Sequence, residues 1–282
     1  MFLRLVCYHI VMRKKEKEVV GKTSELPVKE KKITVKRRSF LDSIFHILFN
    51  IVVAVASLVL LLIFPEAPWA AFLVVIASKF RIFAVKPRFW LANILASLPD
   101  LIFCLGIVVL TWLAGENGAL WLQIILTAIY IVWLLLIKPM TKQSAVTFQA
   151  LLSQFIGISA LFAVADYLTL PVTVLLSFGI GFASARHILL SHQDNQLTLA
   201  SVVWGLIVAE LSFLAYHWSV VYEFFEVIRI SQFALLIVAL SIIVERVYDN
   251  LRKNKGKIKI SEVLWPVAFS LAFILILVIV FN

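Results

Sequence analysis

The chain has 282 residues, of which 62% are hydrophobic and 15% charged, with a mean hydropathy of +1.02 and a formal net charge of +10. Soluble domains average roughly 45–50% apolar and 25% charged residues, so this composition excludes an ordinary soluble domain. Because the apolar residues are gathered into long runs, the sequence predicts an all-α, polytopic membrane bundle of about nine transmembrane helices.

Residues 1–39 are predicted to form a basic, disordered cytoplasmic tail, and residues 40–282 the transmembrane helical domain. The tail holds 12 basic and 4 acidic residues. Its first 12 residues are too short to span a bilayer, and we read them as an N-terminal extension, with Met12 as an alternative start of translation. The tail is either a topology determinant or attracted to anionic lipids. Nucleic acid is not an expected partner, because no aromatic residues interleave with the charges.

Nine apolar stretches carry the topology prediction, and each is near the roughly 20 residues that cross a bilayer. When they are threaded alternately, 25 of the 26 Lys and Arg residues fall on one face, and Arg229 is the exception. The positive-inside rule then predicts a cytoplasmic N-terminus, an outside C-terminus and a multi-pass protein of the plasma membrane. The predicted spans are residues 40–64, 67–85, 90–113, 119–137, 146–168, 171–190, 197–217, 224–247 and 262–281.

Asp100 is the deepest ionisable residue, near the middle of the third span and directly after Pro99. Proline leaves a backbone carbonyl free, and Asp100 would bridge or cap this broken turn. At this depth we expect a protonated carboxylic acid. The functional interpretation is a proton or cation relay, and the structural alternative is a hydrogen bond between helices beside a kink.

The seventh span has two distinct faces. Glu210 and His217 share one face, separated by seven residues, or roughly 10 Å along a helix. The opposite face contains Ser201, Gly205 and Ser212. Gly205 and Ala209 form a spacing of small residues that permits close helix packing. We therefore expect this span inside the bundle. The Glu210–His217 line either carries protons or holds a polar ligand, or else Glu210 is satisfied by a neighbouring helix.

Two further groups are predicted on neighbouring spans. Glu226 and Arg229 are three residues apart, so on a helix they would pair, either to orient an anionic headgroup or as a structural ion pair. In the sixth span, small residues at Ser177, Gly181 and Ala185 predict a groove for an adjacent helix, most simply the fifth or seventh span.

The end of the second span combines basic and aromatic residues. This pattern predicts an elbow at the inner surface whose basic groups contact anionic lipid headgroups. The alternative is ordinary positive-inside anchoring. The candidate residues are Lys79, Arg81, Lys86 and Arg88.

No motif in the sequence assigns a reaction. It contains no Walker A, no Gly-Xaa-Ser-Xaa-Gly and no metal-binding Cys/His spacing, so we expect no cofactor, no metal and no catalytic residue. The first hypothesis is a transporter of a small polar solute or ion that uses Asp100, Glu210, His217, Glu226 and Arg229. The alternatives are a structural or assembly subunit with protein partners and, third, a membrane enzyme acting on a lipid-linked substrate.

Overall fold

The structure is a computed structural model that describes residues 40–84, 86–192, 197–218, 221–224, 228–254 and 256–280. The predicted tail, residues 1–39, lies outside the described residues. Within them the chain forms nine α-helices and one small antiparallel sheet. The helices are α2 (Phe40–Ile63), α3 (Trp69–Ser78), α4 (Trp90–Glu116), α5 (Leu120–Val132), α6 (Gln143–Ala163), α7 (Leu170–Ser191), α8 (Leu197–Trp218), α9 (Gln232–Lys253) and α10 (Ile260–Val280).

Short helical turns occupy several connections. Two of them, η1 (Phe80–Ile82) and η2 (Pro87–Phe89), lie between α3 and α4. A π-helical turn, η3 (Trp133–Ile137), continues α5, and η4 (Ala165–Tyr167) follows α6. The fold is therefore all-helical apart from one hairpin, as the sequence predicts.

Six of the described helical segments are long and apolar enough to cross a membrane, which supports a membrane-embedded protein. An apolar helix of about 20 residues is long enough to cross a hydrocarbon layer of about 30 Å. Two shorter apolar segments, Ile47–Ile63 and Trp69–Ser78, precede them. The six are Pro87–Glu116, Leu120–Ile137, Gln143–Ala163, Leu170–Ser191, Leu197–Trp218 and Ile260–Ile279.

The eighth predicted span is wrong at its start. Strands β1 (Val221–Phe224) and β2 (Ile228–Ser231) pair there, with Glu223 opposite Arg229 in the register. Helix α9 begins only after them, because the Ser231 hydroxyl accepts a hydrogen bond from the Phe233 amide at 3.2 Å and caps the helix. Alternating aromatic, branched and charged residues favour paired strands over a helix here.

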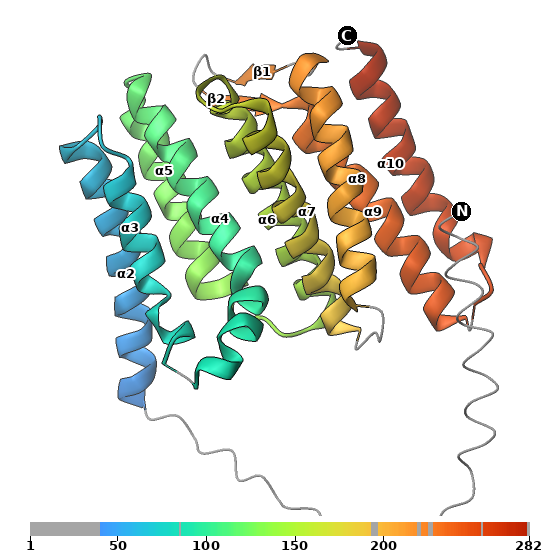
Figure 1. The fold of residues 1–282 in the computed structure, drawn as a ribbon, viewed down its shortest axis with the longest axis horizontal. Coiled ribbons are helices and arrows are strands. Elements are labelled where there is room, and N and C mark those ends of the chain that lie inside the picture. Colours follow the sequence, from blue (N-terminus) through green and yellow to red (C-terminus); the bar gives the residue numbers. More distant parts are fainter. Residues whose placement is uncertain are drawn as a thin grey trace, which may run out of the picture.

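The helices lie side by side, with α2 at one edge of the bundle and α10 at the other (Figure 1). One buried apolar cluster joins α2 to α5 and a second joins α6 to α9, and α6 packs on α4, α7 and α9. We call the end of the bundle with the α3–α4, α5–α6, α7–α8 and α9–α10 connections the basic end. The opposite end, where β1 and β2 lie, is the hairpin end.

Helices α7 and α8 approach closely, as the small-residue patterns predict. A Cβ atom added at Gly181 would lie 2.7 Å from Val208 Cγ2, and one added at Gly205 would lie 3.0 Å from the Phe178 carbonyl oxygen. Only glycine therefore fits at this contact without a shift of the neighbouring helix. The sixth span was predicted to hold a groove for the fifth or seventh span, and at Gly181 the neighbour is α8, which corresponds to the seventh.

Helix α10 is fastened to α9 by polar contacts near both of its ends. At the hairpin end, the Gln232 amide donates to the Leu277 carbonyl oxygen at 2.6 Å. At the basic end, the Asn250 amide donates to the Glu262 carboxylate at 2.8 Å. Between these contacts most of the described α10 side chains are exposed, as expected for a helix that faces lipid.

Candidate functional site

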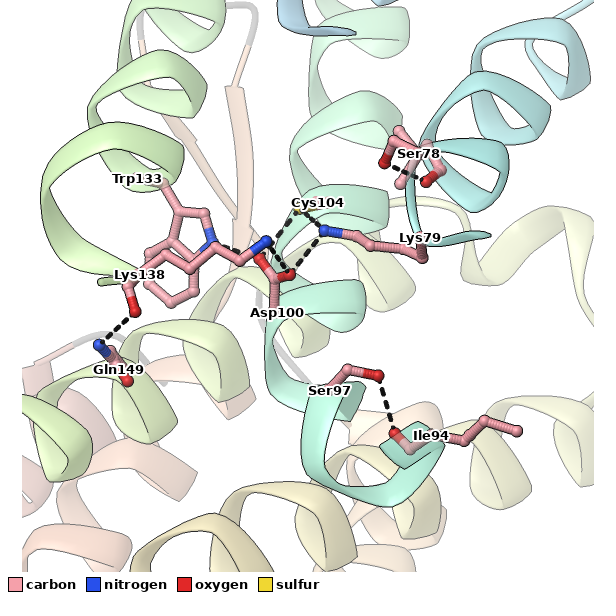
Figure 2. Close-up of polar contacts among 10 residues, drawn as sticks. Ser78, Lys79, Ile94, Ser97, Asp100, Cys104, Trp133, Lys138 and Gln149 are labelled. Carbon is pink, nitrogen blue, oxygen red and sulfur yellow. Dashed lines mark hydrogen bonds and ion pairs between the residues drawn. The ribbon is translucent and has the colours of Figure 1, made fainter. Parts of the chain in front are cut away.

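Asp100 lies on the half of α4 nearer the basic end and is the centre of a polar cluster. Its carboxylate oxygen Oδ2 lies 2.6 Å from Lys79 Nζ and 2.8 Å from Lys138 Nζ. Its other oxygen, Oδ1, accepts a hydrogen bond from the Trp133 indole Nε1 at 3.0 Å. Figure 2 shows the carboxylate between the two lysines, which reach it from opposite sides. We call Lys79, Asp100 and Lys138 the lysine–aspartate cluster.

Three local features bring these residues together. Lys79 directly follows α3, so it lies at the turn where the chain leaves that helix. Lys138 follows the π-helical turn, whose wide hydrogen bond runs from the Lys138 amide to the Trp133 carbonyl oxygen at 2.9 Å. The Trp133 ring stacks on Phe103 with centroids 3.8 Å apart, which fixes the indole that contacts Asp100. A π-helical turn inside an α-helix is frequently associated with a functional site.

The cluster carries two positive charges and one negative charge. The exposed fractions of the side chains are 10% for Lys79, 15% for Asp100 and 39% for Lys138, so one lysine is accessible and one is not. Ammonium groups in contact with a carboxylate stabilise its charged form. Asp100 thus bonds to side chains that follow α3 and α5 rather than capping its own turn, which agrees with the structural alternative of a bond between helices.

A thiol and a phenol extend the cluster toward the interior. Cys104 is fully buried one helical turn after Asp100, and its Sγ lies 3.6 Å from both Lys79 Nζ and Asp100 Oδ1. The buried Tyr130 hydroxyl has no hydrogen-bond partner among the residues that the structure describes. On its interior side the cluster is thus bordered by a buried thiol and a buried phenol.

Gln149 on α6 holds the backbone beside Lys138. Its amide nitrogen donates to the carbonyl oxygens of Ile137 at 2.5 Å and Met140 at 3.1 Å, and its amide oxygen contacts His187 Nε2 at 3.2 Å. Figure 2 shows the further contact with the Lys138 carbonyl oxygen. Helices α6 and α7 thereby hold the backbone beside Lys138, which follows α5 and η3.

A second polar contact joins three helices deeper in the bundle. Gln154 on α6 is 1% exposed, and its amide lies 3.2 Å from Ser184 Oγ on α7 and 2.9 Å from Ser241 Oγ on α9. Each serine also contacts a carbonyl oxygen of its own helix, and a hydroxyl has one proton. Each serine therefore donates its proton to the carbonyl oxygen of its own helix and accepts from Gln154. We orient the Gln154 amide so that its nitrogen faces the two serines, because this orientation satisfies all four contacts.

Glu210 and His217 lie on the exposed face of α8, and the expectation that this helix is interior on both sides is wrong. Gly205 and Ser212, on the opposite face, are buried against α7. Glu210 makes no hydrogen bond or ion pair with any part of the chain that the structure describes. His217 makes edge contacts with the Phe213 and Tyr216 rings instead. The structure therefore does not bring Glu210 together with Asp100.

The predicted headgroup residues do not all face outward. Lys79 turns inward to Asp100, which removes it from the set available to lipid. Lys86 and Arg88 are exposed, and the Arg88 guanidinium lies 4.6 Å from the centre of the Phe89 ring. The side chain of Arg81 lies outside the described residues. A basic group over an aromatic ring is thus present at Arg88, as the sequence pattern predicts.

The sequence predicts that Glu226 and Arg229 lie on one helix. This is wrong, because the backbone of Arg229 belongs to strand β2. Glu226 lies outside the described residues, as does the side chain of Arg229. No group of three or more His, Cys, Asp or Glu side chains suited to a metal ion occurs in the described ranges.

Sequence reasoning missed Lys138, Trp133 and Gln149 as parts of the site. The available signal was their chemistry: Gln149 is a polar amide inside a predicted span, and Lys138 ends another. Comparisons of the chain with protein-family models, with curated proteins and with solved structures find no match. The site must therefore be interpreted from its own geometry, as an ion cluster within an apolar helical bundle.

Proposed function

We propose that this chain is a multi-pass carrier of the plasma membrane that moves a small anionic solute, with the lysine–aspartate cluster as its inner binding site. The observation that carries the proposal is that two ammonium groups share one carboxylate. The N-terminus is cytoplasmic in this proposal, so the basic end faces the cytosol and the hairpin end faces outward.

An excess positive charge in a partly buried site attracts an anion. Each ammonium has three donor hydrogens, and Asp100 Oδ2 is the acceptor for both lysines. Coulomb attraction grows as the surrounding medium becomes less polar, so an entering carboxylate or phosphate oxygen is favoured beside Lys138. Asp100 then holds the two lysines in place while no solute is bound.

The accessible lysine would receive the solute first. Lys138 is the more exposed of the two, and the Gln149 contacts fix the backbone from which it projects. An anion that contacts Lys138 competes with Asp100 for its ammonium group. The remaining Asp100–Lys79 pair stays neutral overall, so binding of one anion neutralises the whole cluster.

The surface around the basic end supports this orientation. Exposed Lys86 and Arg88 lie beside the connection into α4, and we propose that they contact anionic lipids of the cytoplasmic leaflet. Basic residues near a membrane surface also raise the local anion concentration. This attraction of anions would bring solute to the end of the bundle where Lys138 is exposed.

The test is efflux from proteoliposomes loaded with chloride, acetate or inorganic phosphate. Wild-type protein is expected to release at least one of these anions at least tenfold faster than Lys138→Gln. The matched control is Lys257→Gln, which removes an exposed lysine from the α9–α10 connection at the same end. Retention of a trapped neutral dye excludes simple leakage.

Two outcomes would overturn the proposal. One is release of all three anions at the rate of protein-free liposomes. The other is equal release by wild type and Lys138→Gln, because the accessible lysine is the residue that must meet the anion. Thermal unfolding of each variant in detergent verifies that the helices remain folded.

A further inference from the structure

The exposed face of α8 has a regular row of side chains, which we call the seam, and Glu210 is the acid within it. Side chains separated alternately by four and three residues line this face, the spacing by which one helix packs on another along its length. Leu206 is 51% exposed and Phe213 is 48% exposed, and Glu210 lies between them. The seam consists of Leu199, Val203, Leu206, Glu210, Phe213 and His217.

Glu210 lies deep along this helix. It is within about 4 Å of the midpoint of α8, at a rise of about 1.5 Å per residue. An ionisable side chain facing hydrocarbon at such a depth is costly and commonly has a partner. His217, two turns further along the seam, is too far to contact it and pairs with aromatic rings.

Among the described side chains, none supplies a cation to Glu210. Lys79 and Lys138 are held by Asp100 at the other side of the bundle, and the main packing contact of α8 is with α7 through its opposite face. A second copy with its α8 on this seam would bring carboxyl toward carboxyl, which is unfavourable for two charged acids.

We propose that this seam binds a transmembrane helix of another protein, and that the helix presents a lysine or arginine at the depth of Glu210. Charge complementarity selects this partner, since a basic side chain supplies a counter-ion that none of the described side chains gives Glu210. The seam spacing fits a crossing angle of about +20°, which is common in membrane bundles. This surface is independent of the proposed anion site, because it lies on a different helix and attracts the opposite charge.

The test uses the full chain in liposomes with synthetic Leu-rich transmembrane peptides. One peptide has a single Lys at its centre, a second has Leu there, and a third has the Lys near one end. Energy transfer between a dye on the peptide and a dye on the protein reports association. The central-Lys peptide is expected to bind at least tenfold more tightly than either of the others.

Variants assign that preference to the seam. Glu210→Leu is expected to abolish it, while Glu262→Gln, which changes an exposed acid at the basic end of α10, is expected to retain it. A conservative Glu210→Gln variant tests the charge with little change in shape, and is expected to reduce the preference. Thermal unfolding confirms that each variant is folded.

Four results would overturn the proposal. The first is equal binding of the three peptides to wild type. The second is a central-Lys preference that survives in Glu210→Leu. The third is Glu210-dependent self-association of the protein in liposomes without peptide, which would assign the seam to a second copy. Displacement of the central-Lys peptide by Glu210-dependent binding of tetraphenylphosphonium at equal affinity would likewise assign the face to a lipophilic cation.

Discussion

Asp100 and Glu210 are both acids in apolar helices, yet their surroundings are opposite. Asp100 contacts two ammonium groups and an indole N–H, whereas Glu210 faces outward with no hydrogen-bond or ion-pair partner among the described residues. An acid that its own chain satisfies helps to hold helices together. An acid without such contacts among the described residues adds none of this bonding, and the proposed transmembrane partner would supply it from outside.

The largest expected effect follows from Asp100→Leu. This change leaves Lys79 buried without its counter-ion, and breaking a buried ion pair costs roughly 3–5 kcal/mol. We expect a loss of that size in the free energy of unfolding, measured by circular dichroism in mixed micelles. The double variant Lys79→Leu with Asp100→Leu should recover most of it. A loss below about 1 kcal/mol in the single variant would show that the two acids do not differ as described.

Helix α8 presents Glu210 outward because its other face fits α7, and Gly205→Ala tests this. The added Cβ would meet the Phe178 backbone carbonyl, and overpacking of this kind costs typically 1–3 kcal/mol. The control is Gly179→Ala on α7, where an added Cβ meets no atom within 4 Å. That variant should unfold at or slightly above the wild-type temperature. Equal effects of the two changes would contradict the close contact.

A smaller effect is expected from Gln149→Leu, which tests the support of the lysine–aspartate cluster. The change removes the amide that donates to the carbonyl oxygens of Ile137 and Met140, at a cost of about 1 kcal/mol. Besides lower stability, we expect faster chemical labelling of the Lys138 amine, followed by mass spectrometry. An unchanged labelling rate would mean that α6 does not hold this lysine.

The smallest expected effect is that of Glu210→Leu on the isolated protein. No hydrogen bond or ion pair of the described residues is lost, so the free energy of unfolding should stay within about 0.5 kcal/mol of wild type. The same unfolding measurement as for Asp100→Leu makes the comparison direct. A large loss would reveal an internal partner for Glu210 and would remove the distinction between the two acids.

The sequence predicts the helices well because long apolar runs and small-residue spacing are local signals. Most predicted spans agree with the helices within a few residues, and the close contact through Gly181 and Gly205 was predictable from spacing. The start of α9 was not predictable from apolar runs, since a short apolar run fits a strand as well as a helix. The alternation in Val221–Phe224 and Ile228–Ser231 was the missed signal.

The lysine–aspartate cluster was not predictable from local patterns. Asp100 is 21 residues from Lys79, and its indole partner Trp133 is 33 residues away. Such contacts depend on which helices become neighbours, and a single sequence does not state this. The prediction that both faces of the seventh span are buried was wrong for a related reason. Helical periodicity groups residues into faces but does not say which face contacts protein.

The two polar ties between α9 and α10 also bear on the order in which the chain is made. Helix α9 leaves the ribosome before α10, and at that moment the amides of Gln232 and Asn250 lack the carbonyl and carboxylate that later receive them. Helix α10 therefore satisfies two polar side chains of the helix made before it.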